Sequence, residues 1–516
     1  MGFRCERILC LFLAQNVIMS DNTRAPKFIE AFIPVIVLIA LLAFNVIVFK
    51  DENGESYATG GPNQIALLFC AVIAAAIGIG QGYSWKTIQQ GMIKSINSSL
   101  GAVLILLIIG ALSGTWMISG VVPTMIYYGL DILSPSYFLV ATCMICAIVA
   151  LATGSSWSTI GTVGLALLGI GSVMGISEGM IAGAIISGAY FGDKMSPLSD
   201  TTNLAPAMAG TELFTHIRYM MYTTIPTLVI TLIIFLFLGL SLDSKTDIAG
   251  IESMQETLNQ TFVISPWLFL VPVVVVALIM MKWDALPALF IGTIAGGIAA
   301  IIAQPTIVNQ LSGITDDYFM SAYVTFFNTI AGESNIETGS VAVNDLLSTG
   351  GMSGMLNTIW LVICSMCFGG AMEVTGMLKK ITSSFMSKVE SAGSLIAKTA
   401  GTCIFFNATT SDQYLAIVVP GRMFSNEFKN RGLKPENLSR TLEDSGTVTS
   451  PLIPWNTCGA FHAGTLGVAT GTYWMFCFFN LISPIMTMLY GFLNIRIRKY
   501  SQEEMESIKN GEATPI

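Results

Sequence analysis

Long apolar runs, separated by short polar segments, follow one another along the whole chain. A helix that spans a bilayer needs about 20 apolar residues. The pattern therefore predicts spanning helices at 28–49, 64–82, 100–119, 217–241, 265–281, 286–303, 355–376 and 472–493. Further glycine-rich apolar stretches, interrupted by polar residues, lie at 136–153, 155–175, 178–192, 393–408, 410–421 and 441–468. Together they predict an all-α polytopic membrane protein with 12 to 14 transmembrane or re-entrant helices.

The composition agrees with this fold class. Of the 516 residues 53% are hydrophobic and only 11% are charged, whereas soluble proteins carry roughly 25% charged residues. The net charge of −8 and the lack of a basic patch argue against a nucleic-acid partner. A soluble enzyme is excluded on the same grounds. With two histidines far apart, His216 and His462, a zinc site or a histidine-based triad has little support, and we interpret His462 as a packing residue.

The charges predict an orientation, because Lys and Arg favour the cytoplasmic side. Basic clusters flank alternate ends of the apolar runs, whereas the polar loops 51–56, 242–262 and 304–350 are acidic. We expect these loops outside and both termini in the cytoplasm, with a tail at 496–516. In the N-terminal tail, 1–27, residues 1–18 resemble a short signal peptide, and Met19 is the expected start.

A motif recurs about 254 residues along the chain. Ser196-Pro197-Leu198 reappears as Ser450-Pro451-Leu452, and the same shift places Gly192 on Gly446. The repeat predicts two related halves of opposite topology, 28–241 and 263–495, joined by an external linker at 242–262. Inverted repeats with discontinuous helices are the architecture of secondary transporters. A broken helix survives in lipid only where it lines a hydrated cavity or a bound ion.

Polar residues at these breaks are the candidate site. Prolines interrupt the helices, while hydroxyl, amide and carboxylate groups supply oxygen ligands. The predicted ion- or substrate-binding residues are Asp193, Ser196, Ser199, Asp200, Thr201, Thr202, Asn203, Ser155, Ser156, Thr409, Thr410, Asp412, Ser450, Asn456 and Thr457. The alternative interpretation makes these segments cytoplasmic turns.

Acidic residues inside apolar runs are expensive and therefore functional candidates. Asp193, Asp200 and Asp412 are the predicted Na⁺ ligands, with Glu373 and Asp444 as weaker candidates. For Asp193 an ion pair with Lys194 is the alternative, and for Glu373 an interfacial salt bridge with Lys379. A carboxylate removed from water holds a proton unless a cation replaces it. Mutually exclusive occupancy of one carboxylate is enough to couple Na⁺ to H⁺.

The segment GAYFGDKMSPLSDTTNLAPAMAGTELFTHIRYM at 188–220 resembles the NhaC family of Na⁺/H⁺ antiporters. ATGSSWSTIGTVG at 152–164, Gly114-Thr115-Trp116 and TSPLIPWNTCGAF at 449–461 match as well, and the resemblance covers about 25–495. It implies a secondary transporter of the bacterial inner membrane with two related halves. Carried over, the signature residues are Asp193, Ser196, Ser199, Asp200, Thr201, Thr202 and Asn203. The family also includes malate/lactate exchangers, so the resemblance does not fix the substrate.

Exchange of Na⁺ for H⁺ is the leading functional hypothesis, without a cofactor. The alternative is Na⁺-coupled exchange of a small carboxylate or an amino acid, with Lys194 and nearby hydroxyls holding the anion. A membrane-embedded hydrolase is disfavoured because GSSWS at 154–158 is not a GxSxG elbow and no HExxH occurs. The inverted, doubly broken design disfavours a channel. The expected partners are the bilayer, Na⁺ and H⁺, and a homodimer is left open.

Overall fold

The computed structural model describes residues 23–49, 58–242, 248–338, 344, 347–385 and 391–509. Within these ranges the chain is helical, without a strand, and only two isolated bridges occur, Ser334–Thr349 and Leu433–Lys499. The all-α prediction is confirmed. The predicted tail at 1–18, with Met19, and the loop 51–56 lie outside the described residues.

Eight helices of the described chain are long and apolar enough to cross a membrane. They contain Phe28–Asn45, Pro62–Gly80, Trp85–Ile118, Pro135–Thr153, Ser156–Val173, Leu213–Leu242, Ala285–Ala303 and Gly351–Val374. Two bent pairs would raise the number to ten: Ser253–Thr261 with Pro266–Met280, bent by 85°, and Thr470–Phe476 with Phe478–Phe492, bent by 54°. The apolar runs therefore became helices close to where the pattern placed them.

The chain divides into two compact units. Unit 1 comprises Met1–Ser98 and Cys364–Ser387, and unit 2 comprises Ser99–Ile363 and Lys388–Ile516. In unit 1 lie α2 (Phe28–Val48), η1 (Ala58–Gly60), α3 (Pro62–Gly80), α20 (Met377–Phe385), the first part of α4 (Trp85–Ile118) and the end of α19 (Leu356–Val374). Small residues allow close packing there: a Cβ added to Gly370 would lie 2.7 Å from the carbonyl oxygen of Gly91. Each predicted repeat contributes residues to both units.

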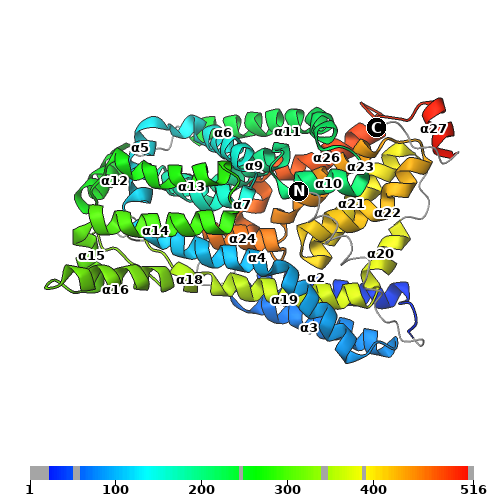
Figure 1. The fold of residues 1–516 in the computed structure, drawn as a ribbon, viewed down its shortest axis with the longest axis horizontal. Coiled ribbons are helices and arrows are strands. Elements are labelled where there is room, and N and C mark those ends of the chain that lie inside the picture. The colour runs from blue at the N-terminus through cyan, green and yellow to red at the C-terminus, as the bar shows by residue number, and fades with distance from the viewer. Residues whose placement is uncertain are drawn as a thin grey trace. The chain divides into compact units, whose positions relative to one another are not determined.

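Unit 2 holds the remaining elements (Figure 1). In its first part they are α5 (Val121–Ile132), α6 (Pro135–Thr153), α7 (Ser156–Thr159), η2 (Ile160–Gly164), α8 (Leu165–Val173), α9 (Glu178–Met195), α10 (Asp200–Ala209), α11 (Leu213–Leu242) and α12 (Ile248–Thr261). Then come η4 (Pro266–Phe269), α13 (Leu270–Met280), α14 (Ala285–Ala303), α15 (Pro305–Ser312), α16 (Tyr318–Ala331) and α18 (Gly351–Gly354). Last are α21 (Ala392–Thr410), α22 (Gln413–Asn430), α23 (Pro435–Leu442), η5 (Glu443–Thr447), η6 (Ser450–Leu452), α24 (Thr457–Leu466), α25 (Thr470–Tyr473), η7 (Trp474–Phe476), α26 (Phe478–Phe492) and α27 (Gln502–Lys509).

Two segments expected to be long polar loops contain helices. Residues 242–262 contain α12, and 304–350 contain α15 and α16. In the first segment Leu258 and Phe262 are buried, and in the second the Asp317 side chain accepts hydrogen bonds from the first backbone N–H groups of α16. A few apolar anchors and a good helix cap therefore outweigh the overall polarity on which the loop prediction depended.

Helices α6, α9 and α11 run side by side, and α6 and α9 approach most closely (Figure 1). Gly188 and Gly192, one turn apart on α9, face the backbone of α6 at Cys143 and Ala147. A Cβ on Gly192 would overlap the Ala147 carbonyl oxygen and would lie 2.6 Å from the Leu151 nitrogen. Small residues at this spacing let helix backbones touch in a membrane.

We expect Gly192→Ala to lower the stability of the folded protein by about 1–3 kcal/mol, because an overpacked contact forces the backbone to shift. Thermal unfolding of the purified protein in detergent measures the change. Gly101→Ala is the matched control, since a Cβ on Gly101 in α4 meets nothing within 4 Å. Equal melting temperatures for the two variants would contradict the close packing of α6 on α9.

Candidate functional site

In the first half of the chain, two helix breaks lie against each other. Helix α6 ends at Gly154, which has a left-handed φ of +71°, and Ser155 then caps α7 by accepting a hydrogen bond from the Ser158 N–H at 3.1 Å. A Cβ on Gly154 would lie 2.6 Å from the Leu198 Cβ and 3.0 Å from the Ser199 nitrogen, both in the break between α9 and α10. Glycine is therefore required where the two breaks meet.

The second of these breaks follows directly from the sequence. Pro197 has no N–H for the carbonyl of Asp193, so α9 ends at Met195. The Thr202 hydroxyl donates to the carbonyl oxygens of Asp193 and Lys194, at 3.2 and 3.0 Å. Ser199 caps the new helix, α10, by accepting from the Thr202 N–H. The hydroxyls of the SDTT segment thus hold the broken end of α9 together.

Asp193 joins the two breaks through its side chain. The carboxylate is buried, 8% exposed, and accepts hydrogen bonds from the Ser156 N–H at 3.0 Å and from the Ser156 hydroxyl at 2.6 Å. The alternative ion pair with the neighbouring Lys194 does not form, because Lys194 turns to a different acid. Asp193 is therefore a buried carboxylate with hydroxyl and amide donors and no ion pair to a described residue.

In the second half, another two breaks also touch. The Thr457 N–H donates to the Ser411 carbonyl oxygen at 2.9 Å, and Asn456 donates to the Asn407 carbonyl oxygen at 3.0 Å. Asp412 is buried and caps α22 by accepting from the Leu415 N–H. Each half thus contains two interrupted helices whose breaks pack together, as the discontinuous-helix prediction requires. The inverted relation between the halves stays a prediction.

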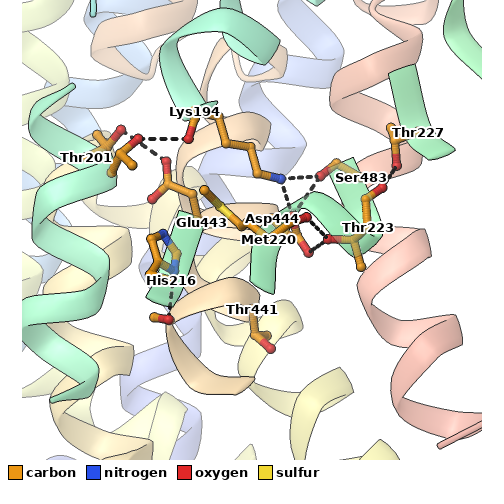
Figure 2. Close-up of polar contacts among 12 residues, drawn as sticks. Lys194, Thr201, His216, Met220, Thr223, Thr227, Thr441, Glu443, Asp444 and Ser483 are labelled. Carbon is orange, nitrogen blue, oxygen red and sulfur yellow. Dashed lines mark hydrogen bonds and ion pairs between the residues drawn. The ribbon is translucent and has the colours of Figure 1, made fainter. Parts of the chain in front are cut away.

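A fully buried ion pair connects the halves. The Lys194 ammonium binds the Asp444 carboxylate, and both side chains are 0% exposed (Figure 2). Ser483 on α26 contacts both charges, at 3.2 Å from Lys194 and 3.3 Å from Asp444, and the Thr223 hydroxyl on α11 donates to Asp444 at 3.0 Å. Such a pair is tolerated inside a protein only with these additional hydrogen bonds.

Glu443, which the sequence reasoning missed, lies beside this pair. Its side chain is fully buried, and Oε1 accepts from the Thr201 hydroxyl at 3.1 Å. Oε2 has no hydrogen-bond partner within the described chain, and the charges of Lys194 and Asp193 both act on the carboxylate. Glu443 begins the π-helix η5, a type of turn that is frequent at functional sites. Its place next to Asp444, just before the Ser450-Pro451-Leu452 break, is the signal that could have identified it.

A second polar group surrounds His462. The His462 Nε2 is 2.9 Å from the Tyr190 hydroxyl, which lies 3.4 Å from the Ser450 hydroxyl. Ser450 donates to Gln413 at 3.2 Å. His462 is fully buried against aromatic rings, among them Phe461, which fits the interpretation as a packing residue, although it also carries a hydrogen bond.

The predicted site residues divide into those that converge and those that do not. Four side chains converge around the first pair of breaks and Glu443: Asp193, Ser156, Thr201 and Thr202. Four others cap helices: Ser155, Ser199, Asp412 and Asn456. The hydroxyls of Thr409 and Thr410 donate to carbonyl oxygens of their own helix. Ser196 is buried and accepts from the Leu198 N–H in the break, Ser450 belongs to the His462 group, and Thr457 starts α24. Asp200 and Asn203 are exposed on α10, and Glu373 lies in unit 1, where Lys94 is its charged neighbour.

The three predicted Na⁺ ligands do not form one ligand set. Among the described residues no group of three or more His, Cys, Asp or Glu side chains could hold a metal ion. The charges of Asp193, Asp200 and Asp412 do all act on Tyr414. Their assignment as Na⁺ ligands stays a prediction.

Basic residues of two segments, Lys434 and Arg496 with Arg498, gather at one end of unit 2. The Arg496 carbonyl oxygen accepts from the Tyr219 hydroxyl at 2.6 Å, and Arg498 pairs with Glu436 at 3.1 Å. The Lys434 ammonium, paired with Glu504, together with the Ser501 N–H, holds the pKa of that carboxyl below its usual value. Basic segments far apart in sequence therefore lie on the same side of this unit.

The chain is similar to known transporters over most of its length. The model of the Na⁺/H⁺ antiporter family matches residues 188–495. The Na⁺/H⁺ antiporter NhaC of Alkalihalophilus pseudofirmus is 39% identical over 463 residues, covering 90% of this chain and 95% of that protein. The malate-2H⁺/Na⁺-lactate antiporter of Bacillus subtilis is 37% identical, with 91% and 96% covered. The arginine/ornithine antiporter ArcD of Halobacterium salinarum is 35% identical, with 94% and 96% covered.

We expect Lys194→Met and Asp444→Asn each to destabilise the protein by about 3–5 kcal/mol, because each leaves an uncompensated buried charge or donor. The double variant should recover much of that loss. Thermal unfolding of the three purified variants measures both effects. Single variants that melt with the wild-type protein would show that the pair does not hold the halves together.

Proposed function

This chain belongs to the Na⁺/H⁺ antiporter family, and we propose that it exchanges Na⁺ for H⁺ at the buried carboxylates of Asp193 and Glu443. One observation carries the proposal. Lys194 neutralises Asp444, which leaves Asp193 and Glu443 buried without an ion pair to any described residue. A carboxylate removed from water needs a proton or a cation, and here the cargo itself is that cation.

The groups around Glu443 suit both ions. The Thr201 hydroxyl and the Asp193 charge lie close to it, and the broken end of α9 supplies carbonyl oxygens of the kind that coordinate Na⁺. A proton needs only one carboxylate oxygen. Because a bound Na⁺ and a bound proton exclude each other at one carboxylate, release of one ion permits uptake of the other.

Alternating access requires a site near the middle of the membrane, at the helix breaks. We propose that the breaks lie within the bilayer and that both termini are cytoplasmic. The gathering of Lys434, Arg496 and Arg498 at one end of unit 2 supports this orientation, because basic residues favour the cytoplasmic side. Alternating access would then expose the same carboxylates to either side in turn.

Na⁺-coupled exchange of a small carboxylate or amino acid is the second candidate. It is favoured by the names of two relatives, a malate-2H⁺/Na⁺-lactate antiporter and an arginine/ornithine antiporter. The predicted anion-binding role of Lys194 fits less well, because its ammonium is held by Asp444. Cation exchange therefore remains the better-supported function.

Reconstitution into proteoliposomes with an interior pH dye separates the two functions. We expect an inward Na⁺ gradient to drive proton efflux in the absence of any organic substrate. Parallel vesicles receive malate, lactate, arginine or ornithine. Proton movement that appears only with one of these compounds would replace cation exchange with the second candidate.

We expect Glu443→Gln and Asp193→Asn each to reduce Na⁺-driven proton efflux by at least about 100-fold, because the amide can neither bind a proton nor neutralise Na⁺. Glu427→Gln is the matched control, since Glu427 forms a partly exposed pair with Arg431 and should keep wild-type flux.

Asp200→Asn distinguishes the sequence prediction from the site built here. If this exposed residue is not part of the exchange site, the variant retains most of its flux. Loss of flux in Asp200→Asn, with wild-type rates in Glu443→Gln, would move the site from Glu443 to the first turn of α10.

A further inference from the structure

Arg440, near the end of α23, is buried in an unusual way. Its side chain is 0% exposed, and Nε, Nη1 and Nη2 donate no hydrogen bond to any described residue. The guanidinium instead lies over the ring of Tyr219, 4.5 Å from its centroid, and 5.9 Å from that of Tyr490. The two aromatic faces offset part of the loss of hydration, but unpaired N–H groups of a buried charge remain strongly unfavourable.

The position of Arg440 places it next to the exchange site. Arg440 and Asp444 are four residues apart at the junction of α23 and η5, the spacing at which side chains share a helix face. Both contact α11 and α26: Arg440 through Tyr219 and Tyr490, and Asp444 through Thr223 and Ser483. Tyr219 and Thr223 are themselves one turn apart. Arg440 therefore lies about one helical turn from the groups that bind Asp444, on the helix that directly precedes η5.

The buried charges around Arg440 differ in whether they are paired. The carboxylates are Asp193, Glu443 and Asp444, with Glu436 on α23 already paired with Arg498, and the fully buried cations are Lys194 and Arg440. In the structure Lys194 binds Asp444, and the charge of Lys194 also acts on Glu443. Within the described chain Arg440 forms no ion pair, and the Oε2 of Glu443 accepts no hydrogen bond. When Glu443 carries neither Na⁺ nor H⁺, Lys194 is the cation whose charge already acts on it.

We propose that Arg440 is a positioning residue of the exchange site, which binds Asp444 when Lys194 turns from Asp444 to Glu443. The proposal rests on the proposed function, because it assigns Arg440 to the step in which Glu443 carries neither Na⁺ nor H⁺. Arg440 then leaves the two tyrosine rings. Glu443 is paired with Lys194, Asp444 with Arg440, and of these three carboxylates only Asp193 has no cation beside it. Lys194 thereby competes with Na⁺ for Glu443 and helps to expel it.

Removal of the Arg440 charge has a distinctive consequence. Without it, Lys194 stays on Asp444, and the unneutralised Glu443 holds Na⁺ more strongly. We expect Arg440→Gln to lower the KM for Na⁺ about tenfold and to lower kcat by a similar factor, each corresponding to about 1.4 kcal/mol. Arg440→Lys keeps the charge and should restore both constants toward wild type.

Asp444→Asn has the opposite effect, because it frees Lys194 permanently for Glu443. We expect this variant to raise the KM for Na⁺, and Arg440→Gln added to it should change nothing further. The constants are measured as Na⁺-driven proton efflux in proteoliposomes of equal protein content. Na⁺-dependent melting of the purified variants gives the affinity without transport. Arg431→Gln, which removes a partly exposed arginine paired with Glu427, is the control and should match wild type.

The outcomes separate the two proposals. Absence of Na⁺-driven proton efflux in the wild-type protein refutes the proposed function itself. Wild-type exchange together with an unchanged KM in Arg440→Gln refutes only the role of Arg440, as does a double variant whose KM differs from that of Asp444→Asn. If Arg440→Gln alone does not fold, the double variant, which leaves neither group unpaired, still gives this comparison. A melting temperature raised by chloride or malate in wild type but not in Arg440→Gln would show an anion site and overturn the proposal.

Discussion

The buried pair between Lys194 and Asp444 is the contact on which the rest of the centre depends. It joins the broken end of α9, from the first half of the chain, to the π-helix η5, from the second. Thr223 and Ser483 contribute hydrogen bonds from α11 and α26, so four elements meet at one carboxylate. Because Asp444 satisfies Lys194, the neighbouring acids Asp193 and Glu443 are buried without an ion pair to any described residue.

Backbone chemistry explains why the polar residues gather there. Each break frees carbonyl and amide groups that lipid cannot satisfy, and the hydroxyls of Thr202 and Ser199 and the amide of Asn456 bind them. Many residues that look like ligands in the sequence therefore perform a structural task first. A serine or threonine beside a break is needed to close the helix, whether or not an ion ever reaches it.

Much of the fold could be predicted from the sequence, since apolar runs such as 286–303 became helices with nearly the same bounds, α14 being Ala285–Ala303. The site was only partly predictable. The Pro197 break and the buried Asp193 follow from local chemistry, because proline ends a helix and an acid in an apolar run needs a reason. The ion pair does not follow from local chemistry, because Lys194 and Asp444 are 250 residues apart. Asp193, which precedes Lys194 in the sequence, was the nearer candidate for its partner. The burial of Glu443 and the exposure of Asp200 depend on how the π-helix η5 and α10 are rotated. The sequence of both segments is short and polar, so it has no hydrophobic periodicity from which this rotation could be predicted.

The glycine contact between α6 and α9 has a mechanical meaning. Gly188 and Gly192 bring the two backbones together without side chains between them, so neither helix can slide along the other by less than a turn without a collision. The two helices therefore form one rigid pair. Gly154 and Ser156 follow the end of α6, and Asp193 lies near the end of α9. The hydrogen bonds between Asp193 and Ser156 lie at the ends of these two helices, so the same contact that fixes the helices also fixes the distance between these two side chains.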